Sequence, residues 1–267
     1  MKARKPAAAK ALTDRHPAPA PVTVASFNLH GTQDNDRWRF GEIARVLLEH
    51  KVEICGFQEV IKGGGIEDTS YQVARYMKEY SGDTYQTWWA YCHPFYDRYP
   101  EGISILSRLP MENPAIIDLN VTIKKGIKPI LPRFAVAAEF RIREKLLLFA
   151  TLHLDHHHAA TLRTAQAVKL LRGLTHQYGQ HHHHATILTG DFNAREQSMA
   201  MRYLRRRGFK DTYREIHATG GNTFPSHDPL ERIDYIMMKG TMHTTSSYLV
   251  MNGNALSDHL GIITIIE

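Results

Sequence analysis

The chain has 267 residues, of which 43% are hydrophobic, enough for the core of one large α/β domain or of two small ones. Its 33 Lys and Arg residues exceed its 27 Asp and Glu residues, so the formal charge is +6 and the isoelectric point is near 9.2. This charge favours an anionic partner, namely nucleic acid, phospholipid headgroups or phosphorylated metabolites. The chain has only two cysteines, Cys55 and Cys92, which excludes a disulfide framework. We predict that both are reduced, partly buried thiols, and a single disulfide bond stays an alternative if the protein is exported.

The first 21 residues, MKARKPAAAKALTDRHPAPAP, are basic and rich in alanine and proline. They hold no apolar run long enough for the core of a signal peptide or for a membrane span. We expect a flexible tail over residues 1–21 and one domain over residues 22–267, because no linker rich in glycine or serine divides the rest. We also expect a cytoplasmic monomer without a protein partner, or a secreted protein if a signal peptide has been removed.

Strand-like and helix-like segments alternate from residue 22 onward. Strands are predicted over residues 22–28, 52–60, 86–92, 101–107, 133–142, 145–154, 185–190, 232–238, 246–251 and 261–267, and helices over residues 37–51, 159–178 and 198–207. Several strands follow one another without a helix between them, which argues against a purely parallel, doubly wound sheet. We therefore predict an α/β (α+β) fold with two mixed β-sheets packed together and helices outside.

Polar side chains stand where apolar strands end: Asn28 after VASF, Glu59 after CGFQ, His153 after FATL, and Asp191 and Asn193 after ILTG. Each alone is an ordinary turn or surface residue. Together they offer the oxygen ligands that hard divalent cations prefer, and Mg²⁺ needs few protein ligands when a substrate phosphate supplies others. The pattern indicates a magnesium phosphoesterase.

Such an enzyme also needs groups that donate and accept protons near neutral pH. His259 in SDHLG has Asp234 in RIDYI as a candidate partner, and His153 has Glu101 in YPEGISILSR. A neighbouring carboxylate fixes the tautomer of an imidazole and stabilises its protonated form.

The order and wording of these motifs resemble the endonuclease/exonuclease/phosphatase superfamily, which has the deoxyribonuclease I-like fold. The resemblance runs through ASFNLHG, GFQEV, EGISILSR, LPRFAVAAEF, ATLHLD, ILTGDFNA, RIDYI and SDHLG, and so covers nearly everything after the tail. It implies a four-layer sandwich of two mixed sheets flanked by helices, with the active site at one edge of the sheets.

The resemblance implies that Glu59 is the principal Mg²⁺ ligand, with Mn²⁺ as an alternative cation, and that Asp258 lies near the metal. Asn28 would lie beside Glu59, on the metal or on the phosphate. Arg133 is similar to the phosphate-binding arginine of the family, and the amide of Asn193 would stabilise phosphoryl oxygens.

For the chemical step, the resemblance implies that Asp191 orients the attacking water. His259, held by Asp234, would be the base or the transition-state donor. His153, held by Glu101, would be its counterpart across the phosphate.

Other features bear on the substrate. Apurinic-site endonucleases of this fold carry tyrosine and asparagine where this chain has TLHLD, so its histidine is more similar to the deoxyribonuclease, deadenylase, sphingomyelinase and inositol-phosphatase branches. Aromatic residues offer a face for bases or lipid headgroups, although packing within a sheet explains at least half of them: Trp88, Trp89, Tyr91, Phe95, Tyr96 and Tyr99. Residues 156–158 are expected at the rim of the cleft, and residues 181–184 in a solvated loop that binds nickel or zinc adventitiously.

Three functions follow for testing. The first is a Mg²⁺-dependent phosphodiesterase, with nucleic acid slightly favoured as substrate because of the positive charge. The second is a lipid or inositol phosphoesterase, disfavoured for lipids because no exposed apolar hairpin is evident. The third is a non-catalytic module that binds phosphate, which predicts losses among the motif acids and histidines that this chain does not show.

Overall fold

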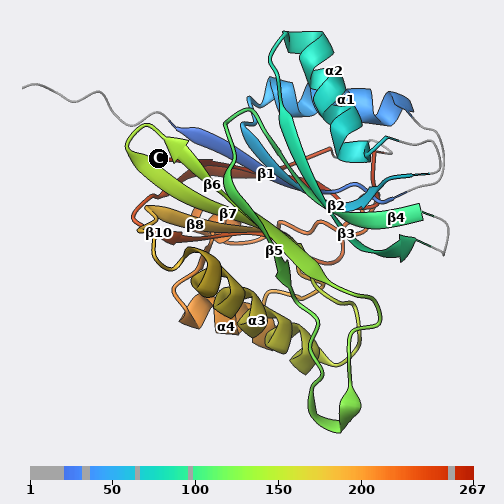
Figure 1. Cartoon of the computed structure of the whole chain (residues 1–267), viewed down its shortest axis with the longest axis vertical. Coiled ribbons are helices and arrows are strands. Elements are labelled where there is room, and N and C mark those ends of the chain that lie inside the picture. The colour runs from blue at the N-terminus through green and yellow to red at the C-terminus, as the bar shows by residue number, and fades with distance from the viewer. Residues whose placement is uncertain (1–20, 32–36, 64–66, 96–98, 252–255) are drawn as a thin grey trace, which may run out of the picture.

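The computed structural model describes residues 21–31, 37–63, 67–95, 99–251 and 256–267, so the expected tail lies almost wholly outside the described residues. In this described part, twelve strands form two mixed sheets of six strands each (Figure 1). In spatial order, the first sheet contains β11 (Thr244–Val250), β12 (Gly261–Ile266), β1 (Val22–Asn28), β2 (Ile54–Ile61), β4 (Tyr99–Ser107) and β3 (Gln86–Phe95). The second contains β5 (Glu112–Asp118), β6 (Phe134–Ile142), β7 (Lys145–His153), β8 (Ala185–Asp191), β10 (Asp234–Gly240) and β9 (Lys210–Asp211).

Helices α1 (Arg37–Glu49), α2 (Thr69–Ser81), α3 (Ala160–Tyr178) and α4 (Met199–Arg206) cover the two outer faces of the sheet pair. The short α5 (Thr212–Ile216) contacts β10 and β11, and the 3-10 turn η1 (Lys124–Gly126) lies in the connection between β5 and β6. Figure 1 shows α1 and α2 on the first sheet and α3 and α4 on the second. Three buried apolar clusters join the layers, and they include Phe27, Ile43 and Met77 under α1 and α2, Val24, Ile105 and Phe149 between the sheets, and Leu170, Leu188 and Met237 under α3 and α4. The four-layer sandwich is confirmed.

Each sheet contains one parallel pair of strands joined through a helix. β1 and β2 are parallel and α1 connects them, while β7 and β8 are parallel and α3 connects them. Parallel strands present their carboxyl ends at the same edge of a sheet, which is where open α/β sheets hold ligands. The two edges meet across the sandwich, because Nε2 of Gln58 on β2 donates to Oγ1 of Thr151 on β7 over 2.8 Å.

The sheet faces that meet each other change from apolar to polar toward this edge. On β7 the side chains of Leu147, Phe149, Thr151 and His153 follow one another on the inner face, as the two-residue period of a strand requires. The apolar end packs the core, and the polar end leaves hydrophilic side chains held by two rigid sheets.

The two sheets approach each other closely at Gly56, near this polar end. A Cβ atom at this position would lie 2.5 Å from the hydroxyl oxygens of Thr151 and Thr189 on the opposite sheet. Glycine therefore permits a sheet separation that any other residue would widen.

All predicted helices and strands are confirmed, with bounds that differ by at most three residues. α2, β5, β9 and α5 were not among the predicted elements. β5 contains Pro114, and it lies at the edge of its sheet, where a residue without a backbone N–H is tolerated. Among the described residues, no helix is both long and apolar enough to cross a membrane.

Cys55 and Cys92 are both buried and unpaired, as predicted. Burial raises the pKa of the Cys92 thiol to about 12, so it stays protonated at neutral pH.

The prediction of a solvated loop for residues 181–184 is wrong for half of it. His181 and His182 are exposed, but His183 and His184 are partly buried. Nδ1 of His184 accepts a hydrogen bond from the backbone N–H of Leu146 over 3.1 Å, which ties this loop to the start of β7.

Candidate active site

The predicted site residues gather at the polar edge of the two sheets, around a cleft of about 800 Å³. Those that line the cleft are Glu59, Glu101, Arg133, His153, Asp191, Asn193, Asp258 and His259. Asn28 and Asp234 contact residues that line the cleft. Asn28 donates a hydrogen bond to Glu59, and Oδ2 of Asp234 lies 2.8 Å from Nδ1 of His259. The structure therefore brings all ten predicted residues to one place.

An irregularity in β2 turns Glu59 into the cleft. The register of β2 against β4 shifts beside this residue, whose φ is +53°. Nδ2 of Asn28 donates to Oε1 of Glu59 over 3.0 Å and lies 3.5 Å from Oδ2 of Asp191. Burial raises the pKa of Glu59, but the positive charge of His153 and the Asn28 hydrogen bond lower it below its ordinary value. Glu59 is thus a carboxylate at neutral pH.

Asn28 and Asp258 both contact His30 at the edge of this region. Oδ1 of Asn28 accepts a hydrogen bond from the backbone N–H of His30 over 2.9 Å, which leaves its amide nitrogen facing the cleft. This orientation favours Asn28 as a donor over a metal ligand. Oδ1 of Asp258 lies 3.5 Å from Nδ1 of His30, and its partly exposed carboxylate lines the cleft.

β8 ends at Asp191 after a glycine that no other residue can replace without strain. Gly190 has φ of +137°, and a Cβ atom there would lie 1.9 Å from the carbonyl oxygen of Leu152. Oδ1 of Asp191 accepts the backbone N–H of Asn193 over 2.8 Å, and Oδ2 lies 3.3 Å from Nε2 of His153. Burial raises the pKa of Asp191, but the charge and hydrogen bond of His153 dominate and lower it to about 2.

His259 and Asp234 form a buried pair. Nδ1 of His259 lies 2.8 Å from Oδ2 of Asp234, which also accepts the hydroxyl of Thr223. Nε2 of His259 points toward Asp191, 3.9 Å from Oδ2. Burial lowers the pKa of His259, but the charge and hydrogen bond of Asp234 and the charge of Asp191 raise it to about 10. His259 is therefore an imidazolium at neutral pH.

In the metal-free chain we expect NMR pH titration of the imidazole Cε1 protons to give His259 a pKa near 10. Because the pKa is raised, His259 should keep its proton at pH values below about 10 and lose it above that value. Asp234→Asn removes the nearest negative charge and keeps the burial, so the pKa should fall to its ordinary range of about 6.5 or below. The exposed Asp228→Asn is the control. Equal His259 values in wild type and Asp234→Asn would contradict the pairing.

Glu101 does not hold His153, contrary to the prediction. Its Oε1 lies 3.2 Å from Nε2 of His93, its cross-strand neighbour, because the β3–β4 register places these residues opposite each other. Burial and the charge of Glu59 raise the pKa of Glu101 to about 8, and burial lowers the pKa of His93. Both are therefore largely neutral near pH 7. Nε2 of His153 lies 3.1 Å from Nδ2 of Asn193 instead.

Arg133 directs its guanidinium into the cleft just before β6. Its Nη2 lies 3.2 Å from Nδ1 of His156, and its buried Nε lies 3.6 Å from Oδ2 of Asp155 without a hydrogen bond. Residues 156–158 line the cleft, which confirms their expected place at its rim, and Arg163 adds a further cation.

Phe95 lines the cleft among the aromatic residues considered for a substrate face. Trp88 and Trp89 are partly buried in β3, and Nε1 of Trp89 donates to the carbonyl oxygen of Val60, so packing explains them. Tyr91 is half exposed, and Tyr96 lies outside the described residues.

Sequence reasoning missed three groups that support the site, His93, Asp155 and Thr223. Asp155 lies within the TLHLD motif and accepts the backbone N–H groups of Ile130 and Leu131, which fixes the loop before Arg133. Asp155 could have been found from the sequence, because the TLHLD motif contains it. His93 and Thr223 could not, because their contacts with Glu101 and Asp234 depend on how the strands and loops pair.

Solved structures share this fold. The chain is similar to an endonuclease/exonuclease/phosphatase family protein from Leptotrichia buccalis, with 19% identity, a TM-score of 0.78, and coverage of 92% of this chain and 99% of that one. It is similar to a mannosyl-6-phosphatase from Bacteroides thetaiotaomicron, with 23% identity, a TM-score of 0.69 and coverage of 92% and 99%. It is also similar to the human nocturnin catalytic domain with bound sulfate, with 19% identity, a TM-score of 0.71 and coverage of 92% and 94%. No curated protein matches its sequence.

The sequence model of the Endonuclease/Exonuclease/phosphatase family matches residues 25–259. This range starts in β1 and ends at His259, so it includes both parallel strand pairs and every residue of the candidate site. The chain therefore belongs to the Endonuclease/Exonuclease/phosphatase family and is a metal-dependent phosphoric ester hydrolase.

Proposed function

We propose that the chain is a Mg²⁺-dependent phosphodiesterase that cleaves a phosphodiester bond with water, with nucleic acid as the favoured substrate. One observation carries this proposal: the anionic Asp191, the protonated His259 and the carboxylate of Glu59 converge on one cleft. Phosphoester hydrolysis needs an oriented water, donors for the phosphoryl oxygens and neutralisation of developing charge. These three residues supply groups of the required kinds.

The oxygen ligands that line the cleft suit a hard divalent cation. Among the described residues, Glu59 makes no ion pair with Lys or Arg, and Asp258 offers a second, partly exposed carboxylate on the same cleft. Oxygen donors of this kind suit Mg²⁺, with Mn²⁺ as a substitute. When bound, the cation neutralises charge on a nonbridging phosphate oxygen.

Asp191, Asp234 and His259 form another group whose ligand atoms all lie within 4.8 Å of one another. We assign them to proton and water handling, because the imidazole Nδ1 of His259 is already engaged by Asp234 at 2.8 Å. A cation on Nδ1 of His259 would displace that charge-assisted hydrogen bond. A cation on Glu59 and Asp258 leaves it in place and competes only with the hydrogen bond from Nδ2 of Asn28 to Oε1 of Glu59.

We assign the attacking water to Asp191, whose low pKa makes it a hydrogen-bond acceptor that orients water. Its Oδ2 lies between two imidazoles, 3.3 Å from Nε2 of His153 and 3.9 Å from Nε2 of His259. As the water oxygen bonds to phosphorus, Asp191 would accept the proton that the water loses, and the protonated His259 would donate a hydrogen bond to the phosphoryl oxygen on which charge develops. As the ester P–O bond breaks, His153, on the other side of the phosphate, would give a proton to the leaving oxygen. The amide nitrogens of Asn193 and Asn28 would add donors for the same oxygens once a bound phosphate replaces one of their present acceptors, which are His153 and Leu154 for Asn193 and Glu59 and Asp191 for Asn28.

Arg133 is the proposed phosphate clamp. Its side chain is 4% exposed, and its buried Nε stays beside Asp155. The terminal nitrogens of the guanidinium are therefore the groups proposed to bind a substrate phosphate, whose geometry a guanidinium matches with parallel hydrogen bonds.

A specific observation favours a second candidate, hydrolysis of a small phosphate ester such as a sugar or inositol phosphate. Five of the Lys and Arg residues and one Asp lie in residues 1–20, so the rest of the chain carries a formal charge of only +2. A long nucleic acid groove needs many cations along it, whereas a cleft of about 800 Å³ holds a small molecule.

A substrate panel with Mg²⁺ and with EDTA tests the proposal. It comprises single-stranded DNA, RNA, bis-p-nitrophenyl phosphate, p-nitrophenyl phosphate, inositol phosphates and sphingomyelin. We expect Mg²⁺-dependent cleavage of the nucleic acids and the diester, and little release from the monoesters. Preferred cleavage of monoesters would replace the first candidate with the second, and activity that survives EDTA would contradict the metal role.

A further inference from the structure

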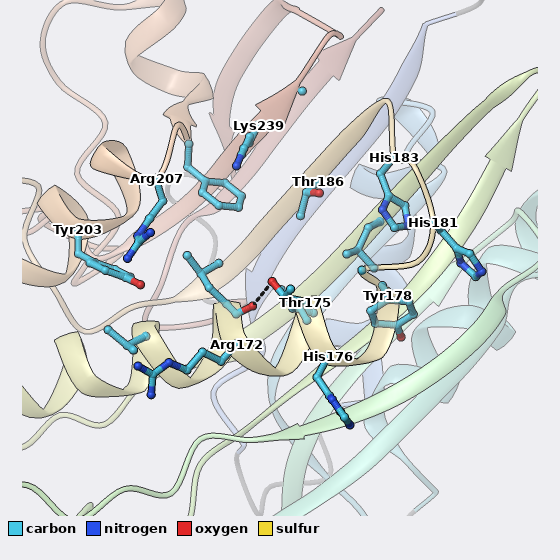
Figure 2. Close-up of a pocket in the computed structure, with 17 residues that line it drawn as sticks. Arg172, Thr175, His176, Tyr178, His181, His183, Thr186, Tyr203, Arg207 and Lys239 are labelled. Atoms are coloured by element: carbon cyan, nitrogen blue, oxygen red, sulfur yellow. Dashed lines mark hydrogen bonds between the residues drawn. The ribbon is translucent and has the colours of Figure 1, made fainter.

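A second cluster of ionisable side chains lies on the α3 face of the second sheet. Glu139 projects from β6, while His181 and His183 come from the loop between α3 and β8. Nδ1 of His181 and Nε2 of His183 lie 2.7 Å and 2.6 Å from the same oxygen, Oε1 of Glu139. Figure 2 shows both imidazoles on the loop just beyond the end of α3, close to Tyr178.

The carboxylate of Glu139 is almost fully buried, with 1% of its side chain exposed. Among the described residues, its ion-pair partners are these two imidazoles, and Lys and Arg take no part. Burial raises the pKa of Glu139, but hydrogen bonds from Asn113 and the two imidazoles lower it below its ordinary value. A buried carboxylate requires a positive partner, which here is either protonated histidine or a metal ion.

We propose that Glu139, His181 and His183 bind a zinc ion that fixes the α3–β8 loop to β6. Two imidazoles and one carboxylate are typical zinc ligands, with water in the fourth position. Their three ligand atoms already lie within 4.8 Å of one another. Tetrahedral bonds of about 2.0–2.1 Å separate ligand atoms by roughly 3.3 Å, so the cluster needs to open by only about 0.6 Å. The exposed side chain of His181 allows this movement.

The surroundings hold Glu139 in place as metal sites require. Nδ2 of Asn113 donates to its other oxygen, Oε2, over 2.7 Å, from an irregular part of β5 where Asn113 has φ of +48°. The buried hydroxyl of Tyr178 donates to the carbonyl oxygens of Asn113 and Ala137, over 2.8 Å and 2.9 Å. Such outer contacts orient the ligands and tune the affinity of a metal site.

This site is distinct from the catalytic cleft. β8 starts directly after the histidine loop at Ala185 and reaches Asp191 at its far end, about 20 Å away, because each step along a strand advances about 3.3 Å. His181 and His183 instead line a separate groove of about 960 Å³, with Tyr178, Arg207 and Lys239 on its walls (Figure 2). Water can therefore reach the fourth position on the metal.

Zinc titration against a chromophoric chelator tests the proposal on the full-length, zinc-free chain with Mg²⁺ present. His259→Ala serves as the background, because it removes one imidazole of the cleft, and zinc held by the remaining cleft histidines is common to all the proteins compared. We expect this protein to bind one equivalent of Zn²⁺. Adding His183→Ala or His181→Ala should weaken binding about 100-fold or more, beyond the 10–100-fold typical of losing an outer contact. Zn²⁺ at 100 times its Kd should also raise the thermal midpoint by roughly 5–10 °C.

The matched control is His182→Ala in the same background, since His182 is an exposed neighbour outside the cluster. It should bind zinc as the background does. Equal zinc affinity and stoichiometry in the His182→Ala and His183→Ala proteins would overturn the proposal. Because the readout is binding, this result does not depend on the proposed phosphodiesterase activity.

Discussion

His259→Ala should lower kcat for phosphodiester hydrolysis by about 10²–10⁴-fold, the usual contribution of one general acid or base. The reason lies in its two ring nitrogens. Nδ1 is held by Asp234, while Nε2 points toward the oxygen of Asp191 that faces the attacking water in the proposed mechanism. The substitution removes a donor whose bond strengthens as phosphoryl charge develops, so kcat falls and KM changes much less.

The exposed His243→Ala is the matched control and should keep wild-type kcat. Because His259 is 5% exposed, a thermal melt of each protein must show that the loss does not come from unfolding. Asp234→Asn provides a second test, since it leaves the imidazole in place and removes its anchor. A folded His259→Ala protein with more than a tenth of wild-type kcat would rule out His259 as the donor.

Much of the site could be predicted because strand ends are visible in the sequence. Asn28, Glu59, His153 and Asp191 follow apolar runs, and both parallel pairs deliver their carboxyl ends to the same edge. The inner-face period of each strand then orients the side chains. The sequence pattern does not predict the local backbone conformation, such as the irregularity at Glu59 and the left-handed turn at Asn193.

The partner of Glu101 could not be predicted, because it depends on strand register. β3 and β4 pair with an irregularity between Tyr91 and His93, and this shift sets His93 opposite Glu101. If the register were shifted by one residue, the side chain of His93 would lie on the other face of the sheet from that of Glu101. His153 was predicted as the partner of Glu101 from the residues and from the family resemblance, but the strand register places His93 there instead.

The missed helix α2 had signals at both ends. Asp68 caps its first turn by accepting the backbone N–H groups of Ser70 and Tyr71, and Gly82 ends it with φ of +80°. Its apolar stripe is interrupted by tyrosines, so the helical periodicity of its sequence is weak.

Glu139 could not be predicted as a buried residue. A lone acid within an apolar strand is usually a solvent-facing residue, but the side chain of Glu139 is buried.

Arg232→Met should lower the free energy of unfolding by about 3–5 kcal/mol, the cost of breaking a buried ion pair from one side. Nη1 and Nη2 of Arg232 donate to Oδ2 and Oδ1 of Asp211 over 2.5 Å and 2.7 Å, and both side chains are 4% exposed. The guanidinium also packs against the rings of Tyr213 and Tyr235, with its carbon 5.2 Å and 4.6 Å from their centroids. Methionine keeps part of that packing but leaves the carboxylate without its partner.

Urea denaturation of the wild type, Arg232→Met and the control Arg195→Met measures this effect. The side chain of Arg195 is 74% exposed and pairs with Glu231 at the surface, so its loss should cost no more than about 1 kcal/mol. Adding Asp211→Asn to Arg232→Met should restore part of the stability. Asparagine removes the unpaired charge and can still cap α5, where Asp211 accepts the N–H groups of Tyr213 and Arg214. A loss in Arg232→Met no larger than that in Arg195→Met would show that the buried Arg232–Asp211 pair does not stabilise the fold.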